Sequence, residues 1–123
     1  MGHGTFAASM LHTAEQIVGK QELVDVVSNE GMSGTLLSEK IRGTVGSDRK
    51  HETIVFVDLP GGSCTISCYS LLKDMDRLDV ICGVNLPILL EFFMLREKHP
   101  ASELVPILIK KGKDNIFKLE QKK

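Results

Sequence analysis

The chain has 123 residues, a length that fits a single domain over residues 1–123 with one hydrophobic core and is short for two domains. Its formal net charge of −1 and its 42% hydrophobic and 25% charged content are typical of a soluble globular protein, and they exclude bulk attraction to nucleic acid or to an anionic membrane. No window has the roughly 18 apolar residues of a membrane helix, and no secretory signal begins the chain. Three cysteines, none in a Cys-x-x-Cys pair, fit a reducing cytoplasm better than a disulfide framework.

In chain order, the first third predicts two helices separated by a strand. Apolar residues at helical spacing predict a helix from Thr5 to a C-cap at Gly19. Residues 23–27, Leu-Val-Asp-Val-Val, predict a short strand, and an amphipathic pattern predicts a helix over residues 33–44. A polar loop then leads to the most informative stretch of the chain.

That stretch is residues 54–63, Ile-Val-Phe-Val-Asp-Leu-Pro-Gly-Gly-Ser. Its four apolar residues predict a strand buried on both faces, which ends at Asp58. A tight turn follows, and Ser63 is well placed to cap the next helix. In an open α/β sheet the carboxyl ends of the strands bind ligands, and a helix N-terminus preceded by glycines favours an anion such as phosphate.

The second half continues the alternation of helices and strands. The pattern predicts a helix over residues 63–75 that buries Ile66, Leu71 and Leu72, and a buried strand over residues 78–82. The remaining expected elements are a helix from Pro87 to about Lys98, a helix over residues 101–111 that stops at Gly112, and a half-exposed edge strand over residues 115–119. This alternation indicates an α/β fold with a parallel sheet covered by helices on both faces.

Three polar residues are expected to meet at the carboxyl edge of that sheet. His3 lies just before the first helix, Asp58 ends one strand, and Asn85 follows another. A carboxylate beside a histidine fixes one tautomer and makes the free ring nitrogen more nucleophilic, as covalent catalysis requires. The residues alone leave a second reading open, in which His3 belongs to a frayed chain end.

Four motifs in register resemble one known family over nearly the whole chain. They are His3-Gly4-x-x-Ala7, Ile17-Val18-Gly19, Val57-Asp58-x-x-Gly61-Gly62-Ser63 and Gly83-Val84-Asn85-Leu86-Pro87. Together they resemble the mannose-type IIA component of the bacterial phosphoenolpyruvate-dependent sugar phosphotransferase system. The resemblance implies a cytoplasmic phosphotransferase that uses no cofactor and works as a homodimer.

The resemblance also assigns roles to individual residues. It implies that His3 accepts a phosphoryl group from the phosphocarrier HPr and passes it to a IIB component, which serves the membrane IIC and IID subunits. It implies that Asp58 orients His3, and that Gly62 and Ser63 hold the phosphoryl oxygens. We expect Asn85 to shape the pocket. The family fold is a three-layer, mainly parallel sheet whose antiparallel C-terminal strand, here residues 115–119, crosses to the partner.

The sequence departs from the family pattern in two places. Cys64, Thr65 and Ile66 replace the Pro, aromatic and Asn residues that usually follow Gly-Gly-Ser, which predicts altered phosphate contacts or partner choice. The family also has a hydrophobic central strand before the Gly-His-Gly segment, whereas only Met1 and Gly2 precede His3 here. We therefore expect the first strand to be missing or truncated, with a gap or a direct pairing of its neighbours, and His3 held loosely over Asp58.

Three alternatives remain at this stage. A dihydroxyacetone-kinase phosphotransfer subunit has a related fold, but its signature places Ser after the histidine and lacks the Gly-Gly-Ser turn. A non-catalytic regulatory module of the IIA type is usually embedded in a longer chain. An inactive, degenerate copy is the third alternative, because of the short N-terminus.

The remaining histidines and cysteines carry no further expected site. His12, His51 and His99 have no Cys or His at ligand spacing, so we predict no metal site. Cys64 and Cys68 lie four residues apart on one helix face, and we expect both to be small buried thiols. The few C-terminal lysines give no argument for nucleic acid as a partner.

Overall fold

The computed structural model describes residues 1–46 and 51–122, which form an α/β fold of five helices and two strands. Its elements in chain order are α1 (Phe6–Val18), α2 (Gly34–Val45), β1 (Thr53–Val57), α3 (Ser63–Asp74), β2 (Leu78–Cys82), α4 (Leu86–Leu95) and α5 (Ala101–Asp114). The five predicted helices and the strands predicted on either side of α3 are thereby confirmed, with ends that shift by a few residues, but β1 is only partly buried except at Val57. The predicted polar loop before the central strand includes residues 47–50, which lie outside the described ranges.

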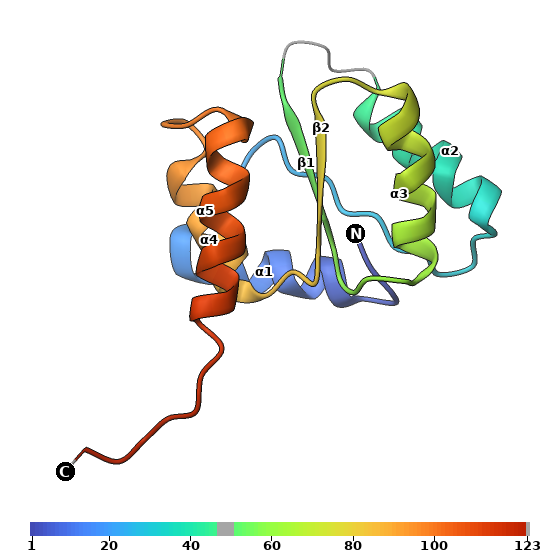
Figure 1. Ribbon diagram of the computed structural model, residues 1–123. Helices are drawn as coiled ribbons and strands as arrows, with labels where there is room; N and C mark the ends of the chain where they lie inside the picture. The colour runs from blue at the N-terminus through green and yellow to red at the C-terminus, as the bar shows by residue number, and fades with distance from the viewer. Residues whose placement is uncertain (47–50, 123) are drawn as a thin grey trace.

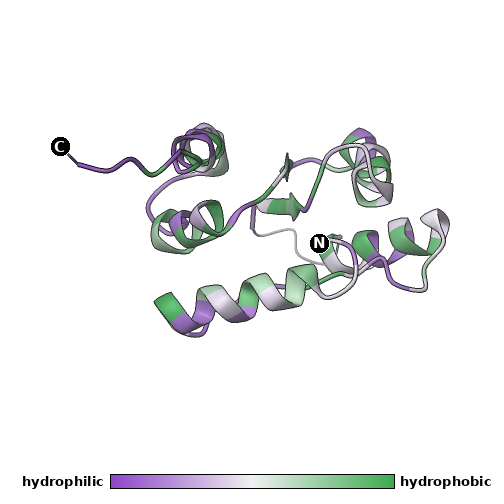
Figure 2. Ribbon diagram, turned by 90° about the horizontal axis from the view of Figure 1, so that it is seen from below, coloured by the Kyte–Doolittle hydropathy of each residue, from purple (hydrophilic) through white to green (hydrophobic). Residues whose placement is uncertain are grey.

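The two strands form a parallel pair in the centre of the molecule, with Thr53 opposite Leu78 and Val57 opposite Cys82. Figures 1 and 2 show α2 and α3 on one side of the strands and α4 and α5 on the other. One core cluster joins the first side to the strands: Val27, Leu37, Ile41, Val57, Cys64, Cys68, Leu71 and Leu78. A second joins the other side: Ile81, Val84, Ile88, Leu104 and Leu108. Parallel strands therefore have an apolar cluster on each face, as the apolar run in β1 predicted.

The first two residues lie beside the carboxyl end of β1, where a further parallel strand would end. Met1 accepts a hydrogen bond from the Asp58 amide at 3.2 Å, beside the end of β1. On its other side, Gly2 donates to the Val27 carbonyl and accepts from the Asn29 amide, both at 3.1 Å, in a parallel bridge. The order in space is thus residues 27–29, residues 1–2, β1 and β2. This order agrees with the expectation that the sheet's central strand precedes His3.

The prediction of a strand over residues 23–27 is wrong. Within the described part of the chain, these residues form no ladder, and Leu23 has a positive φ of 58°. A segment forms a strand only when its backbone hydrogen-bonds to a neighbouring strand. In this register, the neighbour of residues 23–26 would be a segment leading into Met1. The extended segment therefore approaches the sheet only at its end, where Gly2 faces Ser28.

A groove of about 790 Å³ lies between this segment and the free edge of β1. Its lining includes residues 22–27 on one side and residues 51–56 on the other, together with side chains of α1 and α4 such as Met10 and Phe92. Over residues 1–46 and 51–122, no strand pairs with that edge of β1. We expected either a gap or a direct pairing of the neighbouring segments, and the structure has a gap.

Two predicted details of the helices are also corrected. Helix α3 buries Cys64, Thr65, Cys68 and Leu71, whereas Ile66 is 65% and Leu72 42% exposed, because the face toward the core is set by the first turn. Helix α5 does not stop at Gly112 but continues to Asp114. Gly112 is buried against the Ile88 side chain, and a Cβ at this position would clash with it. The glycine therefore permits α4 and α5 to pack closely.

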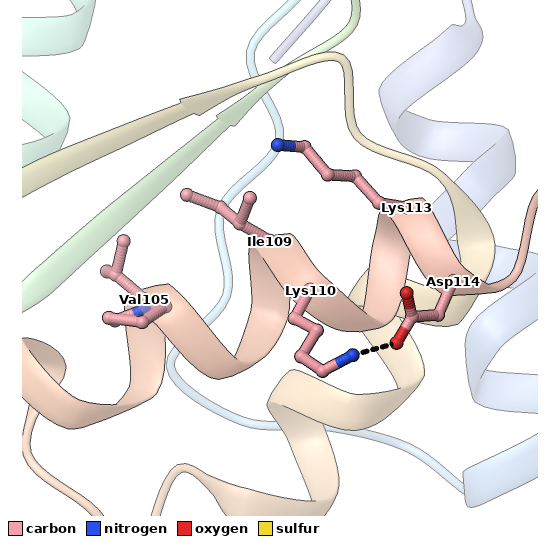
Figure 3. A pocket seen from close by; sticks show the side chains of 6 residues that line it. Val105, Ile109, Lys110, Lys113 and Asp114 are labelled. Carbon is pink, nitrogen blue, oxygen red and sulfur yellow. Dashed lines mark hydrogen bonds and ion pairs between the residues drawn. The ribbon is translucent and has the colours of Figure 1, made fainter.

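The predicted C-terminal strand is not formed in the described chain. Residues 115–122 extend away from the body in Figure 1, and Ile116, Phe117 and Leu119 are at least 70% exposed. A shallow pocket of about 460 Å³ also lies on α5. Figure 3 shows Val105, Ile109 and Lys113 along one side of it and the ion pair between Lys110 and Asp114. Exposed apolar groups on a terminal segment indicate surface that a partner would cover.

No helix among the described residues is long and apolar enough to cross a membrane.

Candidate active site

The site is built around a short contact between His3 and Asp58 at the carboxyl end of β1. His3 Nδ1 lies 2.7 Å from Asp58 Oδ2, and the His3 backbone amide donates to the same oxygen at 2.9 Å. The His3 side chain is 46% exposed, whereas that of Asp58 is only 7% exposed. The expectation that a short N-terminus would hold His3 loosely over Asp58 is wrong, because Met1 and Gly2 are themselves bonded on both sides.

The charge of Asp58 determines which ring nitrogen of His3 carries the proton. Burial alone would raise the pKa of this carboxyl, but hydrogen bonds from the His3 amide, the His3 ring and the Leu59 amide lower it below its usual range. An ionised carboxylate can only accept hydrogen bonds, so Nδ1 carries the proton. In the neutral ring the lone pair is then on Nε2, which is the ring nitrogen left free to act as a nucleophile.

Two glycines let the imidazole and the carboxylate approach so closely. A Cβ on Gly2 would lie 3.1 Å from three atoms of the Asp58 side chain. A Cβ on Gly62 would lie 3.1 Å from His3 Cε1 and 3.7 Å from Nε2. The free nitrogen of His3 therefore lies beside the backbone at the start of α3, and a side chain at either glycine would crowd the site.

The start of α3 is a potential anion site with few side chains in it. Gly61 adopts a left-handed φ of 80°, and Gly62 is the N-cap without any side-chain cap bond. The prediction that Ser63 caps the helix is therefore wrong: Ser63 is its first residue, and its hydroxyl accepts a bond from Asn29 Nδ2 at 3.3 Å. The first amides of a helix have no partner within it and carry partial positive charge, which favours phosphoryl oxygens.

The Asn85 side chain bonds to α4 and α5 and not to His3 or Asp58 in the described ranges. Its Oδ1 accepts a bond from the Ile88 amide at 3.1 Å and thereby caps α4, while its Nδ2 donates to the Gly112 carbonyl at 3.1 Å. Both ends of the side chain thus join α4 to α5. In the described ranges no hydrogen bond links Asn85 to His3 or Asp58, so a role in shaping the pocket stays a prediction.

The three residues that depart from the family pattern occupy distinct surroundings. Cys64 is fully buried, and its potential ligand atom lies within 4.8 Å of those of His3 and Asp58. Burial raises the pKa of the Cys64 thiol, so it is neutral and does not rival His3 as a nucleophile. Thr65 donates to the Leu59 carbonyl at 2.9 Å and closes the turn, whereas Ile66 faces solvent.

The sequence reasoning missed Ser28 and Asn29, which border the site. The Ser28 hydroxyl donates to the Gly4 carbonyl at 2.8 Å, directly after His3, and Asn29 contacts Ser63. Both follow the segment predicted as a strand, so the rule that ligands lie at carboxyl ends of strands could have found them.

Replacing Gly62 by alanine tests whether His3 lies as the structure places it. The new Cβ would displace the ring, and a shift of this size should slow the phosphoryl transfer that the family resemblance implies for His3 by between about ten- and a hundredfold. Gly62 has an ordinary φ of −87°, so the fold should persist. The matched control is Gly43→Ala, where a Cβ meets no atom within 4 Å. Equal transfer rates in both variants, measured by phosphate labelling, would contradict this placement of His3.

Solved structures show which fold this is. An EIIA component of the phosphotransferase system from Streptococcus agalactiae superimposes with a TM-score of 0.86, at 25% identity over 95% of this chain and 92% of that one. The IIA protein associated with the fucose utilization operon of Streptococcus pneumoniae gives a TM-score of 0.80 at 26% identity, over 95% and 88% of the two chains. The fold is therefore that of phosphotransferase-system EIIA proteins.

Sequence relatives then give the family. The EIIA-man family model, described as PTS system fructose IIA component, matches residues 1–108. The mannose-specific EIIAB component of Escherichia coli K12 is 32% identical over 98% of this chain, which spans 38% of that protein's length. The fructose-specific EIIA component of Bacillus subtilis is 32% identical over 85% of this chain and 73% of its own length. The chain belongs to the EIIA-man family, the sugar phosphotransferase components that its motifs resembled.

Proposed function

We propose that this chain is a phosphoryl carrier in which Nε2 of His3 accepts a phosphoryl group from HPr and gives it to a IIB component. The carrying observation is the 2.7 Å contact between His3 Nδ1 and Asp58, which leaves Nε2 as the free nucleophile beside Gly62. The proposed setting is the cytoplasm, and the membrane IIC and IID subunits take part only through IIB.

The transfer needs one bond to form as another breaks. Nε2 of His3 forms a bond to phosphorus while the bond between phosphorus and the donor's histidine breaks, and no cofactor enters. As the ring gains positive character, the buried carboxylate of Asp58 stabilises it through Nδ1. The unpaired amides at the start of α3, with Gly62 and Ser63, hold the phosphoryl oxygens.

The test is labelling from phosphoenolpyruvate in the presence of enzyme I and HPr. The parent chain should gain one phosphate by intact mass, and the label should be acid-labile and base-stable, as for a phosphohistidine. His12→Ala, at an exposed histidine of α1, should be labelled like the parent, whereas His3→Ala should not be labelled. Label that survives in His3→Ala would refute the proposed acceptor. An unlabelled parent chain would favour a non-catalytic, regulatory module.

We further propose that the working form is a homodimer in which the last segment of each chain completes the sheet of its partner. The complete fold would then be a three-layer sheet with an antiparallel C-terminal strand. The support is the exposed apolar row of residues 116–119 on a segment that leaves the body, together with the outer edge of β2, with which no described strand pairs. Such an exchange of an identical element is a common route to a dimer.

Deleting residues 115–123 should convert this dimer to monomer in sedimentation. The deletion begins after α5, which ends at Asp114, and so spares that helix. A full-length chain with Ile116→Ser and Phe117→Ser is the matched variant and should also lose dimer. A truncated chain that remains dimeric would place the interface elsewhere.

A further inference from the structure

A histidine, a carboxylate and a thiol from three separate segments converge beside the start of α3. His3 precedes α1, Asp58 follows β1, and Cys64 lies in the first turn of α3. One potential ligand atom of each lies within 4.8 Å of the other two. Over the described ranges, this is the only group of three or more such side chains that could hold a metal ion. The spacing of these residues does not reveal the group, because they belong to three separate segments of the chain.

The donor types select the kind of ion. An imidazole nitrogen, a carboxylate oxygen and a thiol sulfur form a mixed set that suits zinc, whereas magnesium and calcium prefer oxygen ligands throughout. Zinc bonds of about 2.0–2.3 Å in a tetrahedron place their donor atoms roughly 3.3–3.6 Å apart. The ligand atoms lie within 4.8 Å of one another, so binding would draw them closer together, and the half-exposed His3 side chain is free to adjust its rotamer.

We propose that His3, Asp58 and Cys64 together bind one zinc ion. Three protein ligands leave a fourth tetrahedral position, which would take water. On binding, the Cys64 thiol gives its proton to solvent and its sulfur bonds to the metal, while the carboxylate and the neutral imidazole bind without losing a proton.

Bound zinc also blocks phosphoryl transfer, a consequence that rests on the proposed function. If Nε2 of His3 binds the ion, its lone pair is no longer available to phosphorus. If Nδ1 binds it, the ring proton must lie on Nε2, and the nucleophile is again lost. In both arrangements the ion also takes the Asp58 oxygen that orients the ring. Zinc and the phosphoryl group therefore compete for one site.

Cobalt(II) titration tests the site without any phosphotransfer. Cobalt takes zinc sites and shows a charge-transfer absorption when a thiolate binds it, so the parent chain should bind one equivalent with this band, and zinc should displace it. Cys64→Ser should lose the band and bind at least about tenfold more weakly. Cys82→Ser removes an exposed cysteine outside the cluster and should bind like the parent. His3→Gln, at a half-exposed position, should also lose at least about tenfold in affinity and guards against misfolding of Cys64→Ser.

The second arm measures the zinc concentration that halves the labelling rate, relative to each protein's own rate without zinc. Cys64→Ser should need at least about tenfold more zinc than the parent and Cys82→Ser. Parent-like cobalt affinity in Cys64→Ser and His3→Gln, or a cobalt complex of the parent without a thiolate band, would overturn the zinc site. Absence of labelling in every protein would refute the proposed function, while the cobalt titration would still decide the metal site.

Discussion

Replacing Asp58 by asparagine should slow phosphoryl transfer at His3 by about a hundredfold or more while the fold persists. Asp58 Oδ2 accepts from the His3 amide and ring, and Oδ1 accepts from the Leu59 amide. An asparagine must turn its NH₂ group toward one of these donor sets. If it faces His3, the ring proton moves to Nε2, and if it faces Leu59, the turn loses its bond. In neither case does a negative charge remain to stabilise the phosphorylated ring.

The control for this variant is Asp76→Asn, which removes a carboxylate at an exposed position between α3 and β2. It should be labelled at the parent rate in the assay with phosphoenolpyruvate, enzyme I and HPr. Circular dichroism should show the same helix content for both variants. Parent-rate labelling of a folded Asp58→Asn variant would mean that Asp58 only stabilises the turn.

Adding a strand of about six apolar, β-branched residues directly before Met1 should stabilise the fold by at least several degrees in Tm. The groove between residues 22–27 and β1 has about 790 Å³ and is lined by apolar groups on both sides. An inserted strand would bury that lining and pair with the free edge of β1. It would also continue the direction of Met1 and Gly2, which already bond to both neighbours.

An extension of equal length in glycine and serine is the matched control. It lengthens the chain without apolar surface, so it should leave Tm and the labelling rate near those of the parent. If both extensions give the same Tm, or if the apolar extension does not raise Tm above that of the parent, the groove does not accept a strand in this register.

Sequence patterns within a single segment were sufficient to predict those helices and strands that depend mainly on their own residues. The apolar run of β1, the amphipathic pattern that begins at Ser33 and the proline in the first turn of α4 predicted elements that the structure contains. The pairing of His3 with Asp58 followed from the rule for carboxyl ends of parallel strands, helped by the family motifs.

Features that depend on contacts between distant segments could not be predicted in the same way. Residues 23–27 have strand composition but lack a neighbour along their length, so no ladder forms. The course of α5 through Gly112 depends on its close packing against Ile88, which no single-helix pattern reveals. Cys64 lies beside His3 and Asp58 only because the turn after β1 folds the first residues of α3 back onto the strand end.

The most direct test of the central claim is to identify the nitrogen that carries the phosphoryl group. The phosphorylated chain, made with isotope-labelled histidine, should show phosphorus–nitrogen coupling at one ring nitrogen by NMR. We predict Nε2 of His3, because Nδ1 is held by Asp58 at 2.7 Å. A phosphorus bonded to Nδ1 of His3, or to any nitrogen of His12, His51 or His99, would contradict it.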